Sequence, residues 1–182
     1  MHHTLKLYSR YRERALKFYI FGGWMTRIPL VGNLVKWAAN SYGRNLEGAY
    51  LLTTKEAEEI VDNATELSLG PCACREVFNN CDNPVSAEIM LGFNENIFVE
   101  ERPDDYRKIS KEEARDILRD SHSRGLIHSI IKYRRDFYAI CNCCSCCCVP
   151  LRLNKQYGIG NALNKHGNIV EEFRKQQGVE AR

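Results

Sequence analysis

The chain has 182 residues, of which 44% are hydrophobic and 27% are charged, so it can form one domain with an apolar core and is too apolar for a disordered protein. Its net charge of +3 is unevenly distributed, because residues 1–45 carry eight lysines and arginines against the single acid Glu13. A basic, aromatic-rich arm therefore precedes a mildly acidic body.

The arm contains two expected helices. Apolar residues at helical spacing predict a helix over residues 4–21, broken by the glycine pair 22–23. A second helix is expected over about 30–41, and it should end at the Tyr-Gly pair 42–43.

The basic and aromatic residues of the arm form a candidate docking surface. We divide the chain into this arm, residues 1–45, and a metal-binding domain, residues 46–182. Interfacial helices combine cations with tryptophan, and aromatic residues also anchor protein interfaces. We expect docking on a redox partner protein or larger oxidoreductase complex, or on a membrane face; packing against the body is the alternative, and we expect no nucleic-acid partner. The candidate docking residues are Arg10, Arg14, Lys17, Trp24 and Trp37.

Two capping boxes mark helix starts in the body. The box at residues 53–56 predicts a helix that begins near Thr54 and continues almost to residue 70. The box at residues 110–113 predicts an amphipathic helix that ends near residue 125.

The remaining segments are shorter. We expect a short helix over residues 84–91, a β-hairpin over 126–140 and a polar helix from about 166. These elements predict an α+β fold: a helix-rich single domain with a β-hairpin and two irregular cysteine loops.

The sequence shows no signal peptide and no apolar run of about 20 residues. We therefore expect a cytoplasmic protein, and attachment to the inner face of the membrane is the alternative.

Nine cysteines dominate the chemistry of the sequence. Six of them stand within residues 141–148, and three lie upstream within residues 72–81. All nine are candidate metal ligands: Cys72, Cys74, Cys81, Cys141, Cys143, Cys144, Cys146, Cys147 and Cys148.

Disulfides, lipid attachment and zinc account for this pattern less well. Six cysteines within eight residues cannot pair well with one another, and the total of nine cysteines is odd. S-acylation of the string would leave the upstream cysteines without a role. Zinc fits the C-x2-C spacing, but structural zinc sites usually keep their ligands in two separated pairs, whereas here the pairs are interleaved.

Iron–sulfur clusters account for the pattern best. Cys141, Cys144 and Cys147 form one C-x2-C-x2-C set, and Cys143 and Cys146 form a second C-x2-C set beside Cys148. Two [4Fe–4S] clusters need about eight thiolates, so nine cysteines leave one spare or an uneven division. An uneven division could give one iron a non-cysteine ligand or an open position.

Two segments resemble a known family. Pro71-Cys-Ala-Cys-Arg75 and Cys141-Asn-Cys-Cys-Ser-Cys-Cys-Cys148 are similar to motifs of anaerobe and archaeal 4Fe–4S-binding proteins. The resemblance covers about residues 50–153, and it implies clusters and redox work. It departs from the family at Met90, where many members have a cysteine, and the chain lacks the ferredoxin module that longer members append.

Two further residues are candidates near the clusters. Arg75 follows the Cys-x-Cys pair and could donate hydrogen bonds to cluster sulfides, although a structural salt bridge is equally expected. His128 could supply a non-cysteine ligand, but an ordinary core-edge histidine is the stronger interpretation.

We therefore expect an electron-transfer subunit. It would carry two [4Fe–4S] clusters within an anaerobic redox complex and would not itself be catalytic. One alternative is a catalytic or cluster-handling protein with an incompletely ligated iron. The other is a zinc-binding structural module.

Overall fold

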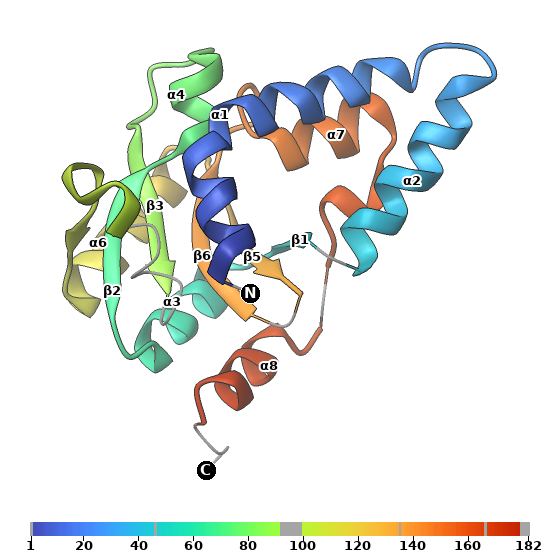
Figure 1. Ribbon diagram of the computed structural model, residues 1–182. Coiled ribbons are helices and arrows are strands. Elements are labelled where there is room, and N and C mark those ends of the chain that lie inside the picture. Colours follow the sequence, from blue (N-terminus) through green and yellow to red (C-terminus); the bar gives the residue numbers. More distant parts are fainter. Residues whose placement is uncertain (1, 46, 92–99, 135, 166, 179–182) are drawn as a thin grey trace.

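A computed structural model describes residues 2–45, 47–91, 100–134, 136–165 and 167–178. The strands in these ranges form one sheet in the order β1-β5-β6-β3-β2-β4, and every neighbouring pair is antiparallel (Figure 1). The strands are β1 (Glu47–Leu51), β2 (Leu67–Pro71), β3 (Ser86–Leu91), β4 (Arg107–Lys108), β5 (Ile127–Tyr133) and β6 (Asp136–Cys143).

Helices cover both faces of this sheet. Helices α3, α6 and α8 pack together on one face, while α1, α2 and α7 lie on the other (Figure 1). The helices are α1 (His2–Met25), α2 (Val31–Asn45), α3 (Thr54–Asn63), α4 (Ala73–Phe78), α6 (Lys111–Ser123), α7 (Val149–Tyr157) and α8 (Ile169–Gln176), with 3-10 turns η1 (Pro103–Asp105) and η2 (Gly160–Ala162).

Successive side chains along each strand point to opposite faces of the sheet, so the sheet has an apolar cluster on each face. Ile89 and Ile140 point into the main apolar core, which the sheet shares with α3, α6 and α8. Met90 and Ala139 point to the opposite face, where they pack with Tyr106, among others. The face of β6 that carries Ala139 also carries Cys141 and Cys143, so these two cysteines face the side of α1 and α7.

The structure confirms the α+β single domain and several of its expected elements. Both capping boxes start helices where predicted: Thr53 accepts a hydrogen bond from the backbone N–H of Glu56, and Ser110 accepts one from Glu113. The expected hairpin is β5 and β6, and α8 is the expected terminal helix.

The helix ends predicted at glycines were wrong. Helix α1 continues through Gly22 and Gly23 to Met25, and α2 continues past Gly43 to Asn45. These glycines serve close packing. A Cβ at Gly23 would lie 2.7 Å from the Tyr157 ring, and one at Gly43 would lie 2.5 Å from a backbone carbonyl.

Two further expectations were wrong. Residues 86–91 form strand β3 rather than a helix, because β2 and β6 pair with its two edges and the apolar clusters on both sides of the sheet bury its two faces. The helix after Thr53 ends at Asn63, and residues 67–71 become strand β2.

The cysteine segments are more regular than the two irregular loops we expected. Cys141 and Cys143 lie within β6, Cys74 lies in α4, and Cys72 and Cys148 stand at the N-terminal caps of α4 and α7.

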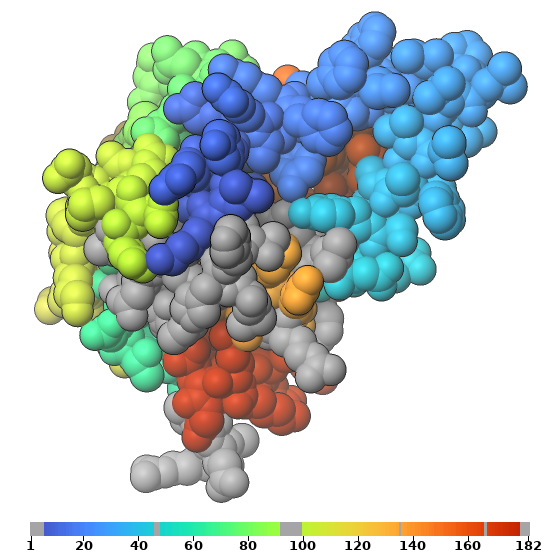
Figure 2. All heavy atoms as spheres, in the orientation of Figure 1, coloured from blue at the N-terminus to red at the C-terminus, as the bar shows by residue number. Residues whose placement is uncertain are grey.

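The arm is a helical hairpin. Helix α1 packs against α7 and α4, and the tip between α1 and α2 projects from the rest of the molecule (Figures 1 and 2). The division of the chain after residue 45 stays a prediction, since residue 46 lies outside the described residues. None of the helices in the described ranges has the length and apolar character needed to cross a bilayer.

Candidate metal centre

Four cysteines meet on one side of the turn that follows β6. The sulfurs of Cys81, Cys144, Cys146 and Cys147 all lie within 4.8 Å of one another, and we call these residues the four-cysteine group. The Cys81 sulfur lies 3.6 Å from that of Cys144 and 3.9 Å from that of Cys147. Four convergent thiols of this kind can hold a metal ion or a cluster.

Local backbone structure brings Cys81 to this position. Helix α4 ends at Phe78, and the next residue, Asn79, adopts a left-handed conformation with φ 42°, which reverses the chain. Asn80 then donates its backbone N–H to the Cys147 sulfur at 3.3 Å and its side-chain amide to the Cys146 carbonyl at 3.1 Å. The upstream loop is thereby fixed to the cysteine string.

Hydrogen bonds already favour a thiolate in this group. Partial desolvation raises the pKa of Cys81, but hydrogen bonds with Asn83, Cys146 and Cys144 outweigh it and lower that pKa to about 6. Desolvation raises the pKa of Cys147 to about 12. Because metals bind the thiolate form, Cys81 is prepared as a ligand at neutral pH and Cys147 would release a proton on binding.

The other five cysteines line one end of a cavity of about 600 Å³. We call them the five-cysteine group: Cys72, Cys74, Cys141, Cys143 and Cys148. Backbone and hydroxyl donors point at two of the sulfurs. The N–H of Val149 lies 3.5 Å from the Cys74 sulfur, and the Ser129 hydroxyl lies 3.4 Å from the Cys143 sulfur. Hydrogen bonds from other thiols lower the pKa values of Cys74 and Cys143.

A buried ion pair borders the five-cysteine group. Arg12 of α1 donates to both carboxylate oxygens of Glu88 on β3, at 2.5 and 2.6 Å. Glu88 is 2% exposed, and one of its oxygens lies 3.6 Å from the Cys141 sulfur. Sequence reasoning missed both residues, because they lie 76 positions apart and neither belongs to a motif.

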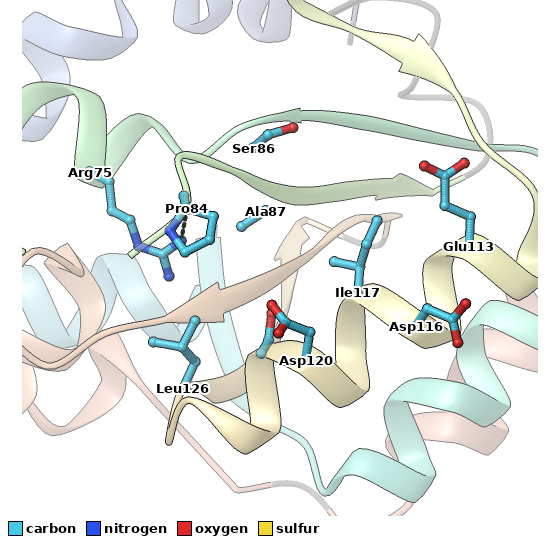
Figure 3. Close-up of a pocket in the computed structure, with 10 residues that line it drawn as sticks. Arg75, Pro84, Ser86, Ala87, Glu113, Asp116, Ile117, Asp120 and Leu126 are labelled. Carbon is cyan, nitrogen blue, oxygen red and sulfur yellow. Dashed lines mark hydrogen bonds between the residues drawn. The ribbon is translucent and has the colours of Figure 1, made fainter. Parts of the chain in front are cut away.

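Arg75 is a buried cation next to both cysteine groups. Its guanidinium donates to the backbone carbonyls of Pro84 and Asn142, and the side chain is 2% exposed (Figure 3). Burial lowers the pKa of Arg75, but the nearby thiols, above all Cys72 and then Cys144, raise it by more.

No carboxylate of the described residues forms an ion pair with Arg75. Glu113, Asp116 and Asp120 of α6 line the same hollow of about 280 Å³ that reaches Arg75 (Figure 3). Glu113 pairs with Arg107 instead, and Asp120 with Arg124. A buried cation needs compensating negative charge, and thiolates bound to metal would provide it.

The structure groups the string differently from its C-x2-C spacing. Cys144 and Cys147 lie with Cys146, not with Cys141. The reason is that Cys141 and Cys143 share one face of β6, while Cys144 follows the end of the strand and turns to the other side.

The remaining candidates have distinct surroundings. The His128 ring nitrogen Nδ1 lies 2.7 Å from the side-chain oxygen of Asn142, so this histidine is held within the sheet. Met90 packs with apolar residues on the face of β3 that also carries Glu88.

The predicted docking residues lie on the hairpin. Trp24 and Trp37 are 51% and 69% exposed, and Lys17 is also exposed. Arg10 pairs with Glu101 at 3.3 Å, while the Arg14 guanidinium lies 5.7 Å from the centre of the Tyr11 ring. The two tryptophans are therefore accessible for a contact.

Comparisons of the chain with protein-family models, with curated proteins and with solved structures found no match. The resemblance to 4Fe–4S-binding proteins therefore rests on the cysteine motifs, and the firm conclusion is a group of four cysteines that could bind a metal or a cluster.

Proposed function

We propose that this protein is an iron–sulfur electron-transfer protein with one [4Fe–4S] cluster at each cysteine group. The observation that carries the proposal is the four-cysteine group, in which a cysteine 63 positions upstream of Cys144 joins three cysteines of the string. Thiolate ligands of this kind are typical of iron–sulfur clusters and of zinc. The five-cysteine group accounts for the remaining thiols.

The closeness of the two groups supports a relay. Cys143 belongs to one group and Cys144 to the other, so a single peptide bond joins a ligand of one centre to a ligand of the next. Arg75 lies beside both and would offset the negative charge that each gains when it takes up an electron. Electrons could then pass between neighbouring centres without a moving part.

The distances in the four-cysteine group favour a second candidate there. A tetrahedral ion with metal–sulfur bonds of about 2.3 Å holds its sulfurs about 3.8 Å apart. The observed separations from Cys81, 3.6 and 3.9 Å, match that value. In a cubane each thiolate binds a different iron, so the sulfurs are spread more widely. A cubane at this group would require the four sulfurs to move apart, and a single zinc ion in a structural role is therefore the runner-up here.

A catalytic role has one observation in its favour. The Glu88 carboxylate lies 3.6 Å from the Cys141 sulfur, so it could replace one thiolate as a ligand of an iron in the five-cysteine group. An iron with a carboxylate ligand or an open position would be accessible from the cavity. We rank this below electron transfer, because Glu88 is already bound by Arg12.

The exposed side chains of the hairpin support attachment to a partner protein or to a membrane. Large apolar side chains exposed along residues 7–42 include Phe18, Phe21, Trp24, Leu34 and Trp37. Exposed aromatic patches of this kind mark interaction sites. We propose that the hairpin attaches the protein to a redox partner or to a membrane face.

Metal analysis tests the proposal. Protein purified without oxygen should contain about eight irons and eight acid-labile sulfides per chain and should absorb broadly near ~400 nm. A colourless preparation with stoichiometric zinc would refute the iron–sulfur function. About four irons together with one zinc would indicate a zinc ion at the four-cysteine group and a single cluster at the five-cysteine group.

A further inference from the structure

The cavity at the five-cysteine group extends well beyond the thiols. Its far end lies between the two helices of the hairpin and is formed by Phe18, Gly22 and Met25 of α1 and by Val35 and Ala39 of α2, among others. These residues offer no thiolate, imidazole or carboxylate. A metal centre held by the cysteines would therefore account for the inner end of the cavity only.

The far end of the cavity is mostly apolar, and the hydroxyl groups of Tyr19 and Tyr42 there hydrogen-bond to each other at 3.1 Å. Its walls are aliphatic and aromatic, and the rings of Phe18, Tyr19 and Tyr42 offer surfaces for a flat apolar group. The total volume of about 600 Å³ falls within the roughly 300–1,000 Å³ of small-molecule sites. Polar groups are concentrated at the inner end, where Arg12 and Glu88 meet.

The exposed residues around the far end indicate how an apolar molecule would enter. Trp24 and Trp37 are exposed on the two helices that form it, and Leu30 at the tip between them is 96% exposed. The hairpin thus presents exposed apolar side chains close to a largely apolar cavity. A molecule dissolved in lipid could pass from one to the other without crossing water.

We propose that this cavity binds a lipid-soluble quinone, with the ring against the metal centre that the five-cysteine group holds and the apolar chain between α1 and α2. The proposal rests on the proposed function, because the quinone would exchange electrons with the centre bound there. Reduction of the ring to a hydroquinone would take two electrons, one from each reduced centre, and the redox partner protein would reduce the centres again; two protons from two water molecules, which leave two hydroxide ions, would convert both C=O groups into C–OH groups.

A cavity-filling variant tests the binding directly. Gly22 lines the cavity, and a Cβ added there would meet no atom within 4 Å, so Gly22→Phe can place a ring in the far end. Ala39→Phe would fill the cavity from the opposite helix. Asn33→Phe is the control, because Asn33 is exposed on α2 and does not line the cavity.

The measurement is calorimetric titration of the anaerobically purified full chain with a decyl-substituted benzoquinone. Wild type and Asn33→Phe should bind ~one molecule per chain, while Gly22→Phe and Ala39→Phe should bind at least about tenfold more weakly. Iron, sulfide and zinc contents should be equal in all four proteins, which shows that the cysteine groups are intact.

Three results would overturn the proposal. The first is no saturable binding to wild type; the second is unchanged affinity in both filling variants. The third is equal competition by decylbenzene, which would show a site for any apolar chain. Failure of the proposed function is separate: metal analysis would find no iron, whatever the titration shows.

Discussion

The ion pair between Arg12 and Glu88 tests whether the basic arm is part of the folded core. Both side chains are buried, at 8% and 2% exposure, and two short hydrogen bonds join them. The pair ties α1 to the middle of the sheet beside Cys141. Removing one partner of a buried pair costs about 3–5 kcal/mol, because the other charge stays buried without compensation.

We therefore predict that Arg12→Met and Glu88→Met each lower the free energy of unfolding by about 3–5 kcal/mol. With a urea dependence of about 2 kcal/mol per molar, the midpoint would fall by about 1.5–2.5 M. The double variant with methionine at both positions should lie within about 1 kcal/mol of wild type, because apolar residues can replace a buried pair at little cost.

Urea unfolding of the metal-loaded protein is the assay. Metal content is measured for each variant, since loss of metal would add its own free energy to the result. Arg10→Met is the matched control on the same helix: Arg10 forms an exposed pair with Glu101, and its loss should cost less than about 1 kcal/mol. The reasoning fails if Arg12→Met costs no more than this control, or if the costs in the double variant simply add.

Three further predictions concern the metal groups and the hairpin. Cys144→Ser should remove about half of the iron, because the four-cysteine group has no spare thiol, and adding Cys74→Ser and Cys143→Ser should remove the rest; iron that falls no further in the triple variant would contradict the division into two groups. Arg75→Met should lower the reduction potential of the centres in protein-film voltammetry and Arg75→Lys should largely preserve it, because the buried cation stabilises the more negative reduced state; equal potentials in the two variants would make Arg75 purely structural. Replacing Trp24 and Trp37 with serine should abolish co-flotation with phosphatidylserine vesicles even at low salt. If the variant still floats at low salt and only high salt releases it, the attachment is electrostatic instead.

Local signals in the sequence were sufficient where structure depends on neighbouring residues. The capping residues Thr53 and Ser110 act within one helical turn, and both helices begin where they indicate. Gly23 and Gly43 misled because the reason for a glycine there is a distant neighbour, Tyr157 or Asn161, that needs the space. Strand β3 was missed for the same reason, since its strand character depends on two partners far away in the chain.

The candidate site divides in the same way. Residue type alone singled out all nine cysteines as candidate ligands, because thiolates bind soft metals and clusters and nine of them stand in two short segments. Their division into groups was not predictable, since it depends on which face of β6 each residue occupies and on the reversal of the chain at Asn79. Glu88 and Arg12 could be found only from the tertiary structure, which brings α1 against the sheet.

Helix α4 connects the two metal groups physically. It has only six residues, too few to be stable alone, and it carries Cys72 and Cys74 at one end while Cys81 follows the other. Arg75 lies on the same helix. Its guanidinium donates to the backbone carbonyl of Pro84, which precedes β3, and to that of Asn142 in β6. Metal bound at either group would thus hold α4 in place, so part of the binding free energy becomes folding free energy. The core beneath α3, α6 and α8 contains no cysteine, and it would keep its packing while α4 and the cysteine string loosened first on metal removal.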